Sequence, residues 1–205
     1  RNSDVTPEGY DIYDNATGTP EVTGVSNEAR GVSLTTEWDI SDDYTAKVVA
    51  SRRTSKYKAG LDDDGTIYSL DQYPERGEAD QTSIEVQLNG YINEYTDFVA
   101  GLYYFNEEGS NRQGSDSSFD GGGNTLQLDQ ETTSKAVYLN LRHDLTDELS
   151  VSGGIRYTED EKDASANVFD ALGTIFDSNE WDEVTWDLAT NYTFENGMTG
   201  YATIQ

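Results

Sequence analysis

The sequence has no cysteine, only one histidine and only three prolines among its 205 residues. Without cysteine, neither a disulfide framework nor a thiolate metal site can form. No stretch approaches the roughly 18 to 20 consecutive apolar residues that a membrane-spanning helix needs. These absences exclude the disulfide-rich class and the helical membrane class.

Positive charge is also scarce, since 13 Lys and Arg residues stand against 40 Asp and Glu residues and give a formal net charge of -27. Such a chain repels phosphate backbones, so nucleic acid is excluded as a partner. Aromatic residues make up 11% of the chain. Because disordered chains are poor in aromatic residues, we expect this one to fold.

Apolar and polar residues alternate strictly in several stretches. Successive side chains of a β-strand point to opposite faces, so such alternation is typical of a strand with two different faces. Val32, Leu34 and Trp38 share one parity, with polar residues between them. The pattern recurs around residues 83–89, 137–142, 149–158 and 183–192. The sequence therefore predicts an all-β fold.

Short polar turns recur at a nearly constant interval. They begin at Ser41, Asn93, Asp144 and Glu195, which gives spacings of 52, 51 and 51 residues. Between them lie longer segments rich in acidic and small residues, at roughly 58–78, 106–131 and 159–179. Each interval thus holds two strands joined by a long loop. The pattern predicts about eight strands in four hairpins.

The order of these connections places all short turns at one end of a meander and all long loops at the other. Bacterial outer-membrane barrels have short periplasmic turns and longer extracellular loops. Several expected strands exceed the roughly 9 to 11 residues needed to span a membrane. We therefore predict a segment of a transmembrane antiparallel up-and-down β-barrel, whose apolar face meets lipid and whose charged face lines the lumen.

Two other classes remain open at this point. One is a self-contained eight-stranded outer-membrane barrel with a structural or adhesion role, because eight is a permitted strand number. The other is a soluble, acidic, calcium-binding extracellular β-sandwich. The run Asp62–Gly65 offers the oxygen ligands that Ca²⁺ favours, but it lacks the spacing of an EF-hand loop.

Three stretches of the sequence carry a resemblance to a known family. They are FVAGLYYF followed by NEE at 98–108, LTDELS leading to GGIRYTEDEK at 145–162, and NGMTGYATI at 196–204. They resemble recurring strands and turns of the TonB-dependent outer-membrane receptors, and the middle stretch is the most specific. The resemblance covers about residues 30–205.

The resemblance implies a non-enzymatic receptor of the outer membrane that imports a scarce extracellular solute, such as a ferric siderophore or an oligosaccharide. It implies a plug domain, energy from the TonB complex, and contact with outer-membrane lipid and lipopolysaccharide. A plugged lumen goes with about 22 strands. We therefore expect residues 31–205 to form part of a barrel, residues 1–30 to be an irregular extracellular segment, and the plug and remaining strands to lie outside this chain.

Candidate ligand contacts lie toward the long loops. Arg52 and Arg53 belong to a basic cluster, with Lys56 and Lys58, that could meet lipopolysaccharide phosphates, an anionic ligand or simply the nearby acids. Three aromatic residues far from the short turns complete the candidates: Tyr68, Tyr73 and Trp181. No motif indicates catalysis, a metal site or a cofactor.

Overall fold

The computed structural model describes residues 24–62, 71–117, 123–168 and 173–205. These residues form eight β-strands. No helix in this part of the chain could cross a membrane. The strands are β1 (Gly24–Asp39), β2 (Tyr44–Asp62), β3 (Asp71–Asn93), β4 (Thr96–Ser117), β5 (Gly123–Asp144), β6 (Leu149–Val168), β7 (Thr174–Thr193) and β8 (Thr199–Ile204).

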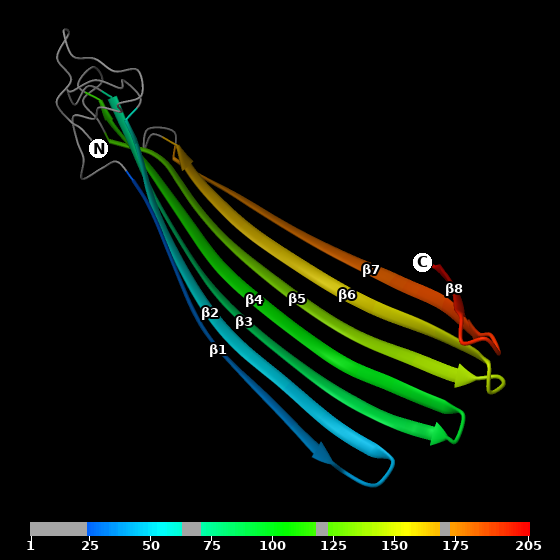
Figure 1. Ribbon diagram of the computed structural model, residues 1–205. Helices are drawn as coiled ribbons and strands as arrows, with labels where there is room; N and C mark the ends of the chain where they lie inside the picture. Colours follow the sequence, from blue (N-terminus) through cyan, green and yellow to red (C-terminus); the bar gives the residue numbers. More distant parts are fainter. Residues whose placement is uncertain (1–23, 63–70, 118–122, 169–172) are drawn as a thin grey trace.

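All eight strands belong to one antiparallel sheet, in which each strand pairs with its neighbours along the chain (Figure 1). The four short turns lie where the spacing predicts them. Backbone hydrogen bonds close them, for example from Ile40 N to Tyr44 O at 2.8 Å and from Leu145 N to Leu149 O at 2.8 Å. In the last turn Gly197 has a φ of 80°, a left-handed conformation that glycine adopts without steric cost. The predicted meander of four hairpins is confirmed.

The strands run much further than the apolar alternation indicates. β2 continues to Asp62 and β3 begins at Asp71, so most of the segment expected as a loop at 58–78 is strand. The same holds for β4, β5, β6 and β7 within 106–131 and 159–179. Beyond the apolar stretches both faces of the sheet are polar. The strands stay hydrogen-bonded to their neighbours there, although apolar and polar residues no longer alternate along the sequence. β1 likewise begins at Gly24 rather than near residue 31.

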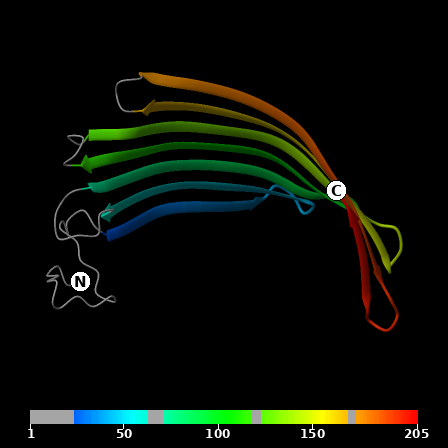
Figure 2. The ribbon, with the colours of Figure 1, turned by 90° about the horizontal axis from the view of Figure 1, so that it is seen from above.

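The sheet has almost no core. Among the described residues only Ala46 and Ala136 are buried hydrophobic side chains, while many large apolar side chains are exposed. A soluble sandwich needs a second sheet packed on the first, so that alternative is wrong. Figure 2 shows a curved, open sheet, and β1 and β8 do not pair with each other. A self-contained eight-stranded barrel requires these two edge strands to pair, and the described sheet is not closed in this way.

The two faces differ sharply at the end of the sheet that carries the short turns, here called the turn end. We name the face of Leu34 and Val137 the outer face, and the face of Glu85 and Tyr138 the inner face. Toward the turn end the outer face forms an apolar band with no charged side chain among its described residues. Its larger members are Val32, Leu34, Trp38, Ile40, Tyr44, Val48, Ile84, Val86, Leu88, Phe98, Leu102, Tyr104, Val137, Leu139, Leu141, Leu149, Val151, Ile155, Tyr157, Val184, Trp186, Leu188 and Tyr192.

The upper border of this band runs obliquely across the strands. On β7 the border lies at Val184, which is in register with Thr36 on β1, whereas on β1 itself the band reaches Val32. Four residues are about 13 Å along a strand and six strand spacings are about 29 Å, so the border slopes by roughly 25°. The strands of a membrane barrel are tilted relative to the bilayer normal. The edge of the hydrocarbon layer therefore meets neighbouring strands at different register rows, which gives the apolar band an oblique border.

Candidate functional site

At mid-height the inner face carries a network centred on Tyr138. Its hydroxyl donates a hydrogen bond to Glu85 at 2.6 Å and accepts one from Gln87 Nε2 at 3.0 Å. The Arg156 guanidinium lies over the rings of Tyr138 and Tyr103, with 5.9 Å and 5.5 Å between its Cζ and the ring centroids. These contacts join β3, β4, β5 and β6 and fix the aromatic rings against the sheet.

A polar hollow of about 630 Å³ adjoins this network on the inner face. Arg156 and Glu85 line it together with Glu183 and Asp187 of β7. Gly154 lies between two of the lining residues, since a Cβ added to it would be 2.3 Å from Asn140 Oδ1 and 2.4 Å from Asp187 Oδ1. The hollow therefore presents mainly carboxylate and amide oxygens.

A second inner hollow, of about 540 Å³, lies toward the opposite end of the sheet, the loop end. Tyr57 of β2 lies beside Gly77 of β3, its register partner. Asn111 of β4 donates hydrogen bonds to the Tyr57 hydroxyl at 3.0 Å and to Glu75 Oε1 at 2.8 Å. The three side chains form a closed hydrogen-bonded triangle across three strands.

The triangle shifts two pKa values in opposite directions. Burial, followed by the hydrogen bond to Glu75, raises the pKa of the Tyr57 hydroxyl. The hydrogen bonds from Tyr57 and then Asn111 lower the pKa of Glu75. A hydroxyl donating to a carboxylate favours the protonated phenol and the ionised acid, as both directions require.

The predicted ligand contacts divide between the two faces. Arg53 is on the inner face and lines the loop-end hollow, whereas Arg52 is on the outer face, 4.0 Å from Asp80. Tyr73 of β3 and Trp181 of β7 lie on the inner face, and Trp181 is 54% exposed. Tyr68 lies outside the described residues. The structure thus brings Arg53, Tyr73 and Trp181 to one face of the sheet and places Arg52 on the other.

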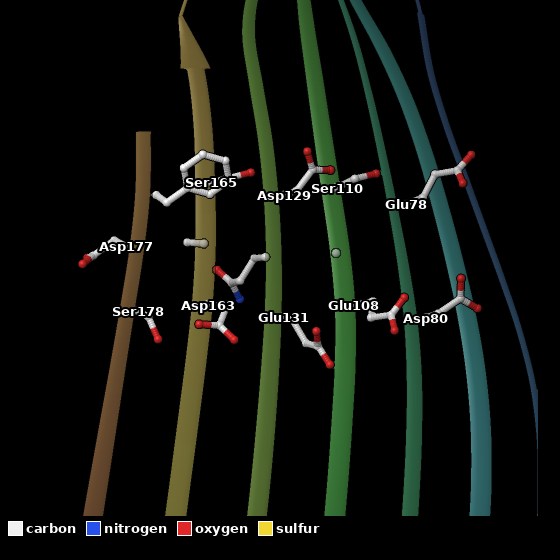
Figure 3. Close-up of a pocket in the computed structure, with 14 residues that line it drawn as sticks. Glu78, Asp80, Glu108, Ser110, Asp129, Glu131, Asp163, Ser165, Asp177 and Ser178 are labelled. Carbon is white, nitrogen blue, oxygen red and sulfur yellow. The ribbon is translucent and has the colours of Figure 1, made fainter. Parts of the chain in front are cut away.

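The outer face carries an acidic hollow beyond the apolar band, toward the loop end (Figure 3). Four carboxylates occupy one register row on adjacent strands, namely Asp80, Glu108, Glu131 and Asp163. Across the part of the chain that the structure describes, no three acidic or histidine side chains are placed to hold a metal ion. The row is therefore a solvated acidic surface.

Sequence reasoning missed Tyr57, Asn111 and Tyr138. Each owes its position to partners on neighbouring strands, up to 54 residues away along the chain. The two tyrosines share one signal, a tyrosine opposite a glycine in an antiparallel pair, which requires the register to be known.

A long-stranded, curved and coreless sheet with an uncharged oblique band on one face is the wall of a transmembrane β-barrel. The whole chain, residues 1–205, matches the family described as TonB dependent receptor-like, beta-barrel. The chain belongs to this family, whose members are receptors and transporters of the Gram-negative outer membrane rather than enzymes. Comparison with curated proteins gives no match.

Solved structures share the fold. The ferric yersiniabactin uptake receptor FyuA from Yersinia pestis is 17% identical, with a TM-score of 0.72 over 87% of this chain and 28% of its own. The ferric-catecholate import receptor Fiu from Escherichia coli K12, in its closed form, is 14% identical, with a TM-score of 0.70 over 89% of this chain and 33% of its own. The siderophore receptor PiuA from Acinetobacter baumannii is 13% identical, with a TM-score of 0.66 over 87% and 32%. The chain spans about a third of these proteins.

Proposed function

We propose that this chain forms part of the barrel wall of an outer-membrane receptor that imports a scarce extracellular solute with energy from TonB. The solute is a ferric siderophore or an oligosaccharide. The observation that carries the proposal is the outer apolar band, which is free of charge in its described residues and oblique to the strands. Family membership supports the transport role, and the siderophore receptors that share the fold support the ferric siderophore as one of the two solutes.

In this proposal the inner face lines the lumen and meets the plug domain, which lies outside this chain together with the remaining strands. The loop end faces the cell exterior, and residues 1–30 contribute to the extracellular side. Arg53, Tyr73 and Trp181 contact the solute, together with Tyr68. Arg52, on the outer face with Lys56 and Lys58, faces lipopolysaccharide.

The membrane position has a direct test in the full-length receptor. Leu102 is on the outer face in the apolar band, and Asn89 is on the inner face three register rows nearer the turn end. Leu102→Arg costs about 2 to 4 kcal/mol near the bilayer midplane, whereas Asn89→Arg, facing the lumen, costs little. Urea unfolding in lipid vesicles measures both. Equal tolerance of the two substitutions would remove the basis of the proposal.

The transport role is tested in cells. Bacteria that depend on this receptor are supplied with limiting iron as a ferric chelate, or with an oligosaccharide as the only carbon source, with and without a functional TonB complex. We expect growth on one of these sources to require both the receptor and TonB. Growth that is unchanged without TonB would show passive diffusion through a pore.

A further inference from the structure

The outer face beyond the apolar band is divided by charge between its two sides. On β2, from Arg52 to Lys58, every charged side chain of this face is a cation. On β6 and β7 beyond the band, every charged side chain of this face among the described residues is an anion. The strands between them, β3, β4 and β5, carry charges of both signs. We name the two sets the basic pole, which is Arg52, Lys56 and Lys58, and the acidic pole, which is Glu159, Glu161, Asp163, Glu180 and Asp182.

Both poles begin at the same level above the membrane. On β2 the first outer-face residue past the apolar band is Arg52, which follows Ala50 along this face. On β6 it is Glu159, which follows Tyr157, and on β7 it is Asp182. The poles start at different register rows, but the border of the band is oblique in the same sense. Their charges therefore stand at equal heights over the hydrocarbon layer.

The acidic pole has no counterion of its own. None of its five carboxylates forms an ion pair within the described residues. Glu159 accepts a hydrogen bond from the Tyr157 hydroxyl at 3.0 Å, which leaves its charge in place. All five residues are exposed. This surface therefore fits a cationic partner.

The basic pole is held only weakly by its own neighbours. Lys56 lies 3.0 Å from Glu78, and Arg52 lies 4.0 Å from Asp80. The Lys56 and Arg52 side chains are 51% and 70% exposed, and ion pairs between exposed side chains are worth about 0 to 1 kcal/mol. These cations therefore remain available to an anionic partner that presents several carboxylates together.

We infer that the acidic pole of one receptor docks against the basic pole of a second copy in the same membrane. Copies inserted in the same direction present their poles at the same level, so the two surfaces meet without tilting. Insertion has already removed part of the translational and rotational freedom that association otherwise costs. Where two copies touch, the acidic pole takes the place of lipopolysaccharide phosphates at the basic pole. The inference goes beyond the proposed function and does not depend on the imported solute.

The test measures association of the full-length receptor in phosphatidylcholine vesicles, which contain no lipopolysaccharide to occupy the basic pole. Copies labelled with donor or acceptor dyes at Asp147→Cys, in a short turn remote from both poles, report association by Förster resonance energy transfer. We expect transfer between copies at low salt and its loss at 1 M salt, where the Debye length is only about 3 Å. Transfer that is absent at low salt, or unchanged at 1 M salt, would overturn the inference without any pole variant.

Charge reversal then tests each pole separately. The basic-reversed receptor carries Arg52→Glu, Lys56→Glu and Lys58→Glu, and the acidic-reversed receptor carries Glu161→Lys, Asp163→Lys and Glu180→Lys. Each should associate with itself roughly tenfold or more weakly, because like charges then face each other. A mixture of the two should associate again, because each supplies the pole that the other lacks.

The matched control reverses three outer-face cations on the strands between the poles, namely Arg76→Glu, Arg112→Glu and Lys135→Glu. It changes the net charge as much as the basic-reversed receptor does and should leave association unchanged. Circular dichroism and heat-dependent gel mobility verify that each variant is folded. An equal loss in the control, or a mixture that does not recover, would overturn the inference. Loss on reversal of the basic pole alone would assign that pole to a different anion and would overturn it too.

Discussion

Tyr138 lies flat over Gly101, its register partner on β4, so that a Cβ added to the glycine would be 2.3 Å from the tyrosine Cζ. Tyr57 places the Cδ1–Cε1 edge of its ring against Gly77 on the inner face, and Tyr44 places the same edge against Gly90 on the outer face. An aromatic side chain over a strand glycine replaces the packing that the glycine lacks.

Gly101→Ala therefore destabilises the barrel wall. The new methyl group collides with a ring that hydrogen bonds to Glu85 and Gln87 hold in place, and overpacking of this kind costs about 1 to 3 kcal/mol. Urea unfolding of the receptor measures the loss. Gly109→Ala is the control on the same strand, because its Cβ would meet only backbone oxygens at 3.9 and 4.0 Å. Equal stability of the two variants would show that Tyr138 moves aside freely.

The oblique border predicts different surroundings for two residues in one register row. Ile84 on β3 and Glu159 on β6 share this row through Tyr104 and Lys135. A spin label at Ile84→Cys should be accessible to oxygen, which concentrates in lipid, and one at Glu159→Cys to a water-soluble nickel chelate. This chain has no native cysteine that would compete for the label.

A label at Gln87→Cys serves as the control, since it faces inward and should be shielded from lipid. The measurement is power-saturation electron paramagnetic resonance in lipid vesicles. Equal oxygen accessibility at Ile84 and Glu159 would contradict the tilted placement.

The sequence was sufficient for the features that repeat. Turn composition and spacing located all four hairpins, because a short turn needs particular residues in a local stretch. Alternation located the apolar band, because lipid demands apolar side chains at every second position. Neither turn composition nor alternation predicts the strands beyond the apolar band. There β2 continues through Lys58 and β4 through Arg112, with polar residues on both faces. The sequence therefore predicts longer loops than the structure has.

The candidate site was less accessible to sequence reasoning. Arg52 and Arg53 were grouped as one cluster, although adjacent residues of a strand face opposite ways. Tyr57 was not singled out at all. Its role depends on Gly77, Glu75 and Asn111, which meet it only through the register of β2, β3 and β4.

The Tyr57 and Glu75 pair predicts a pH-dependent stability contribution at the loop end. A lowered carboxyl pKa stabilises the folded state above the ordinary pKa of the acid, and that contribution is lost as pH falls through the lowered value. The raised tyrosine pKa contributes below its ordinary value and is lost as pH rises through the raised one. The pair therefore stabilises the fold from weakly acidic to weakly alkaline pH.

Tyr57→Phe removes the hydroxyl and should cost about 0.5 to 1.5 kcal/mol near pH 7, toward the lower figure because both groups are partly exposed. The difference from the unmodified receptor should shrink as pH falls through the lowered pKa of Glu75, because the carboxylate then becomes protonated. Urea unfolding at pH 7 and at the lowest pH at which the receptor stays folded measures it, with Tyr91→Phe as the control. A difference that is the same at both pH values would contradict a charge-assisted hydrogen bond.

The acidic row on the outer face predicts a gain in stability when one charge is removed. Glu108 stands between Asp80 and Glu131 in register, and like charges directly opposite each other in a sheet destabilise it. Glu108→Gln should therefore raise the free energy of unfolding by about 0.2 to 1 kcal/mol at low salt. The gain should decline at 1 M salt, where the Debye length is only about 3 Å.

Glu78→Gln provides the matched control in the neighbouring register row, because Glu78 is paired with Lys56 at 3.0 Å. Removing a paired carboxylate relieves no net repulsion and breaks an exposed ion pair, which is worth about 0 to 1 kcal/mol. Glu78→Gln should therefore be neutral or slightly destabilising at low salt. Two outcomes would contradict repulsion within the row: a gain for Glu108→Gln that persists at 1 M salt, or an equal gain for Glu78→Gln. Either would show that the carboxylates of the row have other partners in the membrane-embedded receptor.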